Sequence, residues 1–280
     1  MLPEQIKNQL NMLKEEIQQA TDIALFGHEN IDPDSAWAML WFGLVLEKLG
    51  KQVSYFTSIA PTESNQFMHW IKKIKTNFDY GKYDLIFFVD FSGYERISWI
   101  TKDHESYFDT KKKIIIDHHI ETEEKPNSFV LRDIDSGSTC GLCYEIVSTL
   151  WNEYIDKESA TLRYTWLLTD TGNFMRSKDA KRDYSIAESL MNLWTDKDSV
   201  IKNLYFSSHQ GLIEMSSITL GRAKIVWDVV YTWYTQEELD NFGISDDEIE
   251  KAHMLLRSVE NVPVFLRLRK DNNQRKWSLR

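Results

Sequence analysis

Short apolar runs, each followed by polar residues, recur along the first part of the chain. We expect four of them to form strands that are buried on both faces: residues 23–26, 52–57, 85–89 and 114–116. An amphipathic pattern over residues 4–20 and an apolar stretch over residues 35–49 predict helices. Buried strands that alternate with helices are typical of a doubly wound parallel α/β sheet, with helices on both faces.

Helical patterns follow the strands. Residues 135–139 (Asp-Ser-Gly-Ser-Thr) predict a loop and a helix cap, and we expect helices over residues 139–151, 158–169 and 179–195. Further along, the pattern predicts a strand over 225–234, an acidic helix over 236–256 and a strand over 262–268. The chain is therefore expected to have an α/β domain over residues 1–195, a linker over 196–214 and a second, smaller α/β domain over 215–280.

Acidic residues and histidines follow three of the predicted strands. They lie at His28, Asp32 and Asp34 after the first strand, at Asp90, and at Asp117, His118 and His119. In open α/β sheets, ligands bind beyond the carboxyl ends of the strands, so we expect these side chains to converge. Two of the acids lie two residues apart in a turn-rich segment, which places both carboxylates on the same side of an extended loop.

Several carboxylates crowded together repel one another unless a cation neutralises them. Mixed imidazole and carboxylate ligands suit manganese, iron, cobalt or zinc better than calcium. These candidate ligands are also more than one metal ion needs if that ion keeps open coordination positions. The pattern therefore predicts two ions that share a bridging carboxylate, about 3.5–4 Å apart, an arrangement that stabilises the attacking and leaving oxygens in phosphoryl transfer.

Four motifs in this order and spacing resemble those of the DHH phosphoesterase family. They are His28-x-x-x-Asp32-x-Asp34, Val89-Asp90, Asp117-His118-His119 and Thr169-Asp170-Thr171-Gly172. The resemblance covers residues 20–195. It implies a hydrolase that uses two Mn²⁺ ions, with Mg²⁺, Co²⁺ or Fe²⁺ as alternatives, to activate water against a phosphate ester.

The resemblance also implies a role for each residue. His28, Asp32 and Asp90 would hold one metal, and Asp34, His118, Asp170 and the bridging Asp90 would hold the other. His119 would face the scissile phosphate, and Asp117 would orient the neighbouring histidine. A few further residues are expected to contact substrate phosphate: Ser138 and Thr139 at a helix start, and Arg176.

Composition narrows the substrate and partners. The formal net charge of −10 argues against binding to long duplex nucleic acid, which needs a broad basic face. By the resemblance, the expected substrates are short oligonucleotides, nucleoside bisphosphates, or cyclic or linear dinucleotides. No apolar run is long enough for a membrane span, and we expect a cytoplasmic protein, with a homodimer left open. The Cys140 and Cys143 pair is expected to be buried as small hydrophobes rather than to bind metal.

Two alternatives to a nucleotide phosphoesterase remain. An inorganic pyrophosphatase of the same fold would need a basic pocket near the C-terminus, where Arg267, Arg269, Lys270 and Arg275 are a weak hint. The second alternative is a metal-loaded or nucleotide-binding module that has no catalytic activity. Measuring turnover against binding separates this module from both enzymes.

The sequence departs from the family pattern in two ways. The chain has 10 Trp but only 11 Gly, and tryptophan stands where the family has glycine at positions 37, 166, 194 and 277 (Trp37, Trp166, Trp194 and Trp277). We infer that these are UGA codons for glycine read as tryptophan; a lineage with cavities that fit the indoles is the alternative. The chain also stops at Arg280, before the family's glycine-rich substrate loop, so a truncated second domain is expected.

Overall fold

The computed structural model describes residues 2–29, 33–58, 69–177, 179–245, 248–271 and 274–279. The chain divides into two compact units, Met1–Ile201 and Lys202–Arg280.

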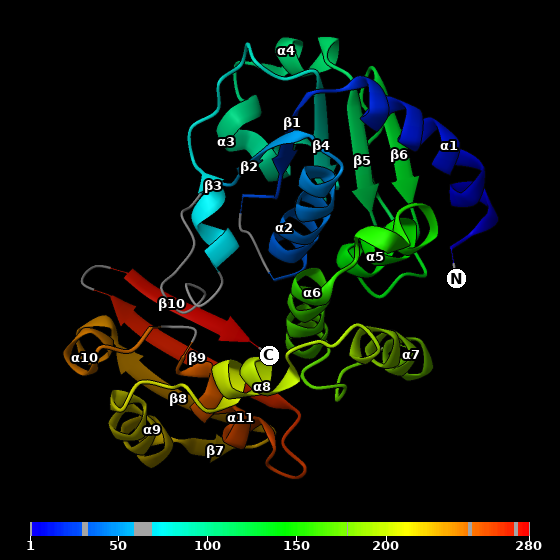
Figure 1. Ribbon diagram of the computed structural model, residues 1–280. Helices are drawn as coiled ribbons and strands as arrows, with labels where there is room; N and C mark the ends of the chain where they lie inside the picture. The colour runs from blue at the N-terminus through cyan, green and yellow to red at the C-terminus, as the bar shows by residue number, and fades with distance from the viewer. Residues whose placement is uncertain are drawn as a thin grey trace. The chain divides into compact units, whose positions relative to one another are not determined.

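The first unit is built on a parallel sheet. Its described strands are β1 (Asp22–Phe26), β2 (Gln52–Phe56), β3 (Ile74–Lys75), β4 (Leu85–Val89), β5 (Lys113–Asp117) and β6 (Ser128–Arg132), and they form one six-stranded sheet in the order β3-β2-β1-β4-β5-β6 (Figure 1). Every described pairing in this sheet is parallel. The expected doubly wound parallel sheet is confirmed.

The two strands that the pattern did not predict are both edge strands. β3 has only two residues, and β6 is half-exposed along most of its length. An edge strand is covered less completely than a central one, so its sequence carries no unbroken apolar run.

Helices cover both faces of the sheet (Figure 1). The helices of the first unit are α1 (Glu4–Gln19), α2 (Pro33–Lys48), α3 (Ser98–Thr101), α4 (Glu105–Thr110), α5 (Thr139–Leu150), α6 (Lys157–Asp170) and α7 (Ala180–Met191), and α8 (Lys197–Tyr205) spans the boundary between the units. The 3-10 helices Tyr94–Ile97 and Asn152–Tyr154 precede α3 and α6, and a third, His69–Lys73, precedes β3.

The strands are apolar on both sides because helices bury both sides. Alternate residues of β1, β2, β4 and β5, including Phe26, Phe56 and Phe88, join an aromatic cluster that also holds Phe108 of α4. The residues between them face α2 and α5, which pack on the opposite side. α2 approaches β2 so closely that a Cβ on Gly43 would lie 2.2 Å from the Tyr55 ring.

The second unit contains a mixed sheet. Its described strands β7 (Lys224–Val226), β8 (Val229–Thr235), β9 (Val264–Asp271) and β10 (Gln274–Leu279) lie in the order β10-β9-β8-β7, with β8 and β9 parallel and the outer pairs antiparallel. Among its described residues, the helices α9 (Gly211–Arg222), α10 (Gln236–Phe242) and α11 (Glu250–Arg257) accompany the sheet. Met215, Tyr234 and Leu239 form part of its core.

Two expectations for this unit were wrong. The strand over 225–234 is a hairpin that turns at Trp227 and Asp228, because only a tight turn lets Val226 pair with Val229. The single helix over 236–256 is two helices. The first ends at Gly243, which has the left-handed φ of 63° that favours glycine at a helix end.

None of the described helices is long and apolar enough to cross a membrane.

Candidate metal centre

The candidate centre lies where the order of the sheet reverses direction. β1 and β4 are neighbours, and the strands that follow them in the chain extend the sheet to opposite sides. His28 follows β1, Asp90 comes directly after β4, and Asp117 ends β5. The carboxyl ends of parallel strands at such a reversal form the usual ligand crevice of this fold.

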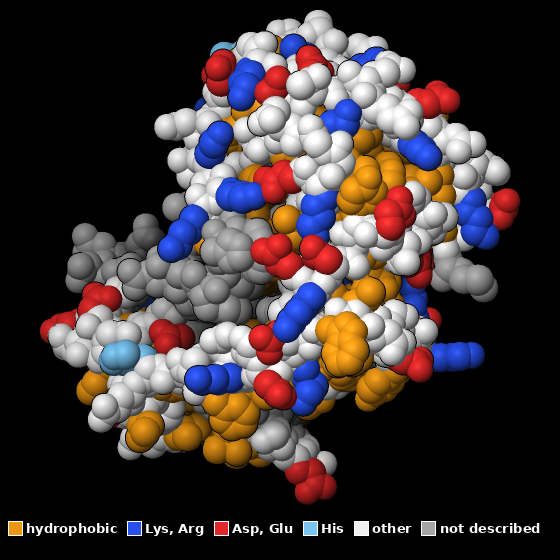
Figure 2. All heavy atoms as spheres, in the orientation of Figure 1, with side chains coloured by type: hydrophobic (Ala, Val, Ile, Leu, Met, Phe, Trp, Pro, Cys, Tyr) orange, Lys and Arg blue, Asp and Glu red, His pale blue; other side chains and the backbone are white. Residues whose placement is uncertain are grey.

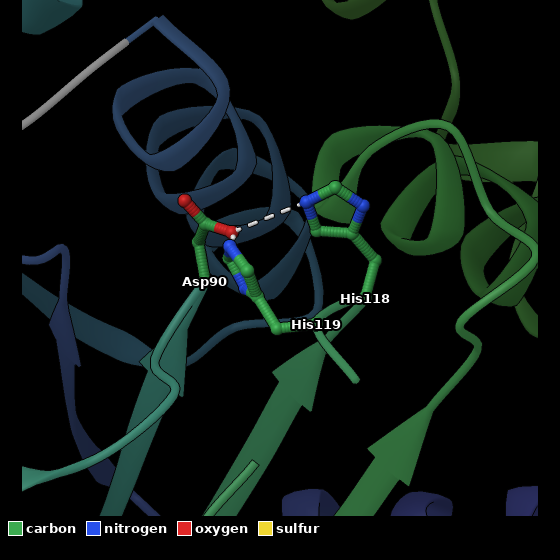
Figure 3. Close-up of side chains that lie close together, drawn as sticks. All are labelled: Asp90, His118 and His119. Atoms are coloured by element: carbon green, nitrogen blue, oxygen red, sulfur yellow. Dashed lines mark ion pairs between the residues drawn. The ribbon is translucent and has the colours of Figure 1, made fainter. Parts of the chain in front are cut away.

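Asp90 is at the middle of the cluster. Its Oδ2 lies 3.4 Å from Nε2 of His28. Its Oδ1 lies 3.7 Å from Nε2 of His118 and 3.5 Å from Nδ1 of His119 (Figure 3). Thr139 also donates its hydroxyl to Oδ1, at 3.0 Å. The residue is 1% exposed and has a φ of 58°. Such a left-handed conformation is uncommon outside glycine and concentrates at functional sites.

Asp34 joins the cluster from the first turn of α2. Its carboxylate accepts hydrogen bonds from the backbone N–H groups of Thr139 (2.8 Å) and Cys140 (2.9 Å), at the start of α5. Its Oδ2 also lies 3.7 Å from Nε2 of His118. The positive end of α5 thus holds a buried carboxylate from a distant part of the chain. The backbone N–H of Thr139, a residue that the sequence suggested for a phosphate, is therefore engaged by Asp34.

Asp117 contacts both histidines that follow it and orients the ring of His119. Its Oδ1 accepts from the backbone N–H of His118 (2.9 Å) and lies 2.7 Å from Nδ1 of His119. Burial raises the pKa of this carboxyl, but hydrogen bonds from Thr122 and His119 outweigh burial, so the pKa lies below its usual value. Asp117 is therefore an ionised acceptor that fixes the His119 ring.

His118 is oriented by a different contact. Its Nδ1 lies 3.2 Å from the carbonyl oxygen of Ser136, which leaves Nε2 facing Asp34 and Asp90. A backbone carbonyl on the remote nitrogen is a common way to fix a ligating histidine.

The donor set fits a divalent transition metal. Ligand atoms of Asp90, His118 and His119 all lie within 4.8 Å of one another, and Asp34 and His28 are buried beside them. Two buried carboxylates in one small space are costly unless cations accompany them. Imidazole nitrogens mixed with carboxylate oxygens are the ligands that manganese, iron, cobalt and zinc accept.

The remaining expected ligands are only partly described. Asp32 lies outside the described residues. The backbone of Asp170 ends α6, but its side chain is outside the described part of the structure. The next residues turn sharply, since Gly172, Asn173 and Phe174 all have positive φ values.

The expected substrate contacts differ in their surroundings. Ser138 is the N-cap of α5 and accepts from the N–H of Gly141, so the predicted helix cap is confirmed. The Thr139 hydroxyl binds Asp90. Arg176 is exposed and donates to the carbonyl oxygen of Thr169 at 3.3 Å.

A pocket of about 330 Å³ opens beside the cluster. Asp34, Asp90, His118 and His119 line it, together with the loop of residues 136–138 and residues of α6 and α7. Ser138 and Arg176 are also in its wall. One residue of the wall, Arg163, was not anticipated, although an arginine within the apolar pattern of residues 158–169 is a signal for it.

The tryptophans and cysteines have distinct environments. Trp37 and Trp166 are buried in α2 and α6, and the side chain of Trp277 is outside the described residues. Trp194 has a positive φ of 59°. Trp227, which the family pattern did not single out, also has a positive φ, of 52°. Cys140 and Cys143 are buried free thiols, as expected.

A family model described as the DHH family, N-terminal domain, matches residues 22–165. The chain belongs to this family, whose members are phosphohydrolases that use divalent metal ions. The matched residues include His28, Asp34, Asp90, Asp117 and both adjacent histidines.

Solved structures with a similar fold include an exopolyphosphatase-related protein from Bacteroides fragilis. It has a TM-score of 0.85 and 23% identity, over 98% of this chain and 83% of that chain. A putative family II inorganic pyrophosphatase from Methanococcus jannaschii has a TM-score of 0.49 and 17% identity, over 92% of this chain and 87% of that chain. RecJ in complex with Mn²⁺ from Thermus thermophilus has a TM-score of 0.44 and 14% identity, over 95% of this chain and 46% of that chain. A comparison with curated protein sequences finds no match.

Proposed function

We propose that this chain is a manganese-dependent phosphoesterase that hydrolyses short oligonucleotides or nucleoside bisphosphates with the help of two metal ions. The observation that carries the proposal is the position of Asp90. One of its carboxylate oxygens faces His28 and the other faces His118. A carboxylate turned to two sets of ligands is suited to bridge two ions.

The two sets of ligands are assigned on this basis. His28 and Oδ2 of Asp90 would hold one ion, and Asp34, His118 and Oδ1 of Asp90 the other. Asp32 and Asp170 would complete the sets, one in each. When bound, the ions would supply a Lewis acid for the phosphoryl oxygens and lower the pKa of a water molecule.

The protein side chains would orient the substrate and stabilise its charge. Asp117 holds Nδ1 of the His119 ring through their 2.7 Å contact, which leaves the other nitrogen for the substrate. In the imidazolium form both ring nitrogens carry a proton, so Nε2–H would be the donor to the phosphoryl group. We assign His119 to the phosphoryl group, where a positioned donor stabilises the charge that develops during hydrolysis.

The size of the pocket and the charge of the chain favour a small substrate. About 330 Å³ is near the lower end for small-molecule sites and far too small for a duplex. On the face shown in Figure 2, the basic and acidic side chains of the described residues are interspersed rather than segregated. Such a surface, with a net charge of −10, does not attract a long polyanion.

A hydrolysis panel with Mn²⁺ tests the proposal. We expect mononucleotides to be released from di- to tetranucleotides, or a 3′-phosphate to be removed from a nucleoside bisphosphate, and long duplex DNA to be left intact. Rapid hydrolysis of pyrophosphate without nucleotide cleavage would instead show an inorganic pyrophosphatase. Nucleotide binding with no turnover of any substrate would show a binding module.

Substitution of Asp90 tests the assignment of the bridging ligand. Asp90→Asn keeps the size of the side chain and tolerates the left-handed backbone, but it removes the shared negative charge. We expect loss of both Mn²⁺ equivalents in calorimetry and loss of hydrolysis. Asp22→Asn, at the opposite end of β1, is the matched control and should bind two equivalents. Full Mn²⁺ binding by Asp90→Asn would disprove the bridge.

A further inference from the structure

Arg163 of α6 is a buried cation in the wall of the pocket. Its side chain is 1% exposed. Within the described part of the chain, none of its three guanidinium nitrogens has a hydrogen-bond partner. A buried arginine is almost always paired, because an uncompensated charge in the interior is costly. This arginine is therefore poised for an anion.

Aromatic rings hold the guanidinium in place. Its Cζ lies 4.0 Å from the centre of the Trp166 ring and 5.3 Å from that of Tyr144. Ring faces attract the flat face of a guanidinium, whereas its N–H donors point outward in the plane. The stacking thus positions the group without using its donors.

Gly141 lies between the guanidinium and two serines of the pocket wall. A Cβ at Gly141 would lie 3.0 Å from Oγ of Ser138, 3.6 Å from Oγ of Ser136 and 3.9 Å from Nη2 of Arg163. All four residues line the pocket. Because glycine has no side chain, a ligand can approach the backbone of Gly141 closely, and the three polar side chains lie around this approach. We call these four residues the Arg163 cradle.

The donors in the cradle suit an oxyanion. Oγ of Ser138 accepts from the N–H of Gly141, so its own hydroxyl proton is available to a ligand. Arg163 offers up to five N–H donors and a full positive charge. Arg182, another arginine in the pocket wall, is instead neutralised by Glu145 through contacts of 3.0 and 2.6 Å.

We propose that the Arg163 cradle binds a phosphate oxygen of the substrate beside the metal cluster, and so makes Arg163 a residue that determines affinity for phosphorylated ligands. This inference rests on the proposed function, since it names where a substrate of that class is held. The fit is chemical: planar N–H donors and a hydroxyl match the oxygens of a phosphate.

Binding of inorganic phosphate to the metal-free full chain tests the cradle separately from catalysis. In EDTA, phosphate should raise the melting temperature of the unmodified protein and bind measurably in calorimetry. Arg163→Met should weaken phosphate binding about ten- to hundredfold, as expected for hydrogen bonds to a charged group. Arg163→Lys should fall in between, because it keeps the charge but loses the planar donors. Gly141→Ala should also weaken binding, because its methyl group fills the cradle.

Stability distinguishes a binding role from a structural one. Without phosphate, Arg163→Met should melt at the same or a higher temperature, because it removes an uncompensated buried charge. Lys102→Met, which removes an exposed cation away from the pocket, controls for net charge and should bind phosphate as before. In Mn²⁺, Arg163→Met should raise KM for the substrate more than it lowers kcat.

The possible outcomes are separable. Unchanged phosphate affinity in Arg163→Met, or no phosphate binding by the unmodified chain, overturns the cradle. A strongly destabilised Arg163→Met with unchanged affinity would show that the arginine is structural. Phosphate binding that depends on Arg163 in a protein without hydrolytic activity would keep the cradle and reject the proposed function.

Discussion

His118 and His119 are adjacent, but different contacts hold their rings. Nδ1 of His118 faces the Ser136 carbonyl, whereas Nδ1 of His119 faces Asp117. We predict that His119→Ala keeps both Mn²⁺ equivalents but lowers kcat by about 10²–10³-fold, the usual loss when one stabilising donor is removed. Calorimetry and turnover measured on the same preparation check this. Loss of one equivalent would mean that His119 is a metal ligand.

Trp194 and Trp227 are bulky residues at positions that suit glycine. Both have left-handed φ values, and their side chains are 83% and 91% exposed, so they gain little from packing. Trp194 follows the last turn of α7, where its N–H donates to Met191. Trp227 opens a two-residue hairpin loop, a position where glycine is the usual residue of a type II′ turn. These positions agree with the idea that the codons encode glycine.

We predict that Trp194→Gly combined with Trp227→Gly raises the melting temperature. Left-handed backbone costs a residue with a side chain about 1–2 kcal/mol, more than the entropy that glycine adds to the unfolded chain. Trp41→Gly is the control. Trp41 is fully buried and donates its indole N–H to Ser159, so its loss should destabilise by about 3–5 kcal/mol. A lower melting temperature in the double variant would contradict the glycine assignment, and TGA codons at both positions would support it.

Trp37 and Trp166 give a less direct test of the same idea. Both are buried, and the ring of Trp166 stacks on Arg163, so replacing them with glycine removes packing and this stacking as well as any crowding. The prediction that this double variant gains stability and metal occupancy stands, and melts with and without Mn²⁺ would check it.

At the scale of elements, the start of β5 buries a lysine. Lys113 is 2% exposed and donates to the backbone carbonyls of Phe108, Lys111 and Pro126. Burial lowers its pKa to about 8, although the charge of Asp109 partly opposes burial and that of Lys125 adds to it. The ordinary value is 10.5. The folded state therefore releases this proton at a lower pH than the unfolded state.

The sign of the resulting pH dependence follows. Below pH 8 both states carry the proton, and the folded state bears the full cost of a buried charge. Between pH 8 and 10.5 the unfolded state binds more protons, so stability rises with pH in this window. We predict that the free energy of unfolding of the unmodified chain, measured in urea, rises by up to a few kcal/mol across this window relative to that of Lys113→Met. A pH-independent difference between the two proteins would show that the lysine keeps its ordinary pKa.

At the scale of the whole molecule, the described cluster belongs entirely to the first unit. His28, Asp34, Asp90, His118 and His119 all lie within Met1–Ile201, which also has its own sheet and core. We predict that a fragment of residues 1–201 folds and binds Mn²⁺ with the affinity of the full chain. Circular dichroism and calorimetry check this. Weaker binding by a folded fragment would show that the second unit supplies a ligand.

The sequence by itself determined the central strands and the residues at their ends. An unbroken apolar run such as Leu85–Val89 is compatible only with burial on both faces, and parallel strands share one carboxyl edge. The position of Asp90 beside His118 and His119 therefore follows from local pattern and the topology that this pattern selects. The edge strand β6 and the break at Gly243 did not follow, because partial burial weakens the periodic signal.

Only the tertiary structure decided which distant groups meet. Asp34 accepts hydrogen bonds from Thr139 and Cys140, residues more than a hundred positions away. Arg163 lies beside Gly141 of another helix, where a Cβ would come within 3.9 Å of its Nη2. Hydrophobic periodicity records which side of an element faces the core. It does not record which helix lies opposite. That pairing placed the Asp34 carboxylate at a helix start and left Arg163 without a hydrogen-bond partner among the described residues.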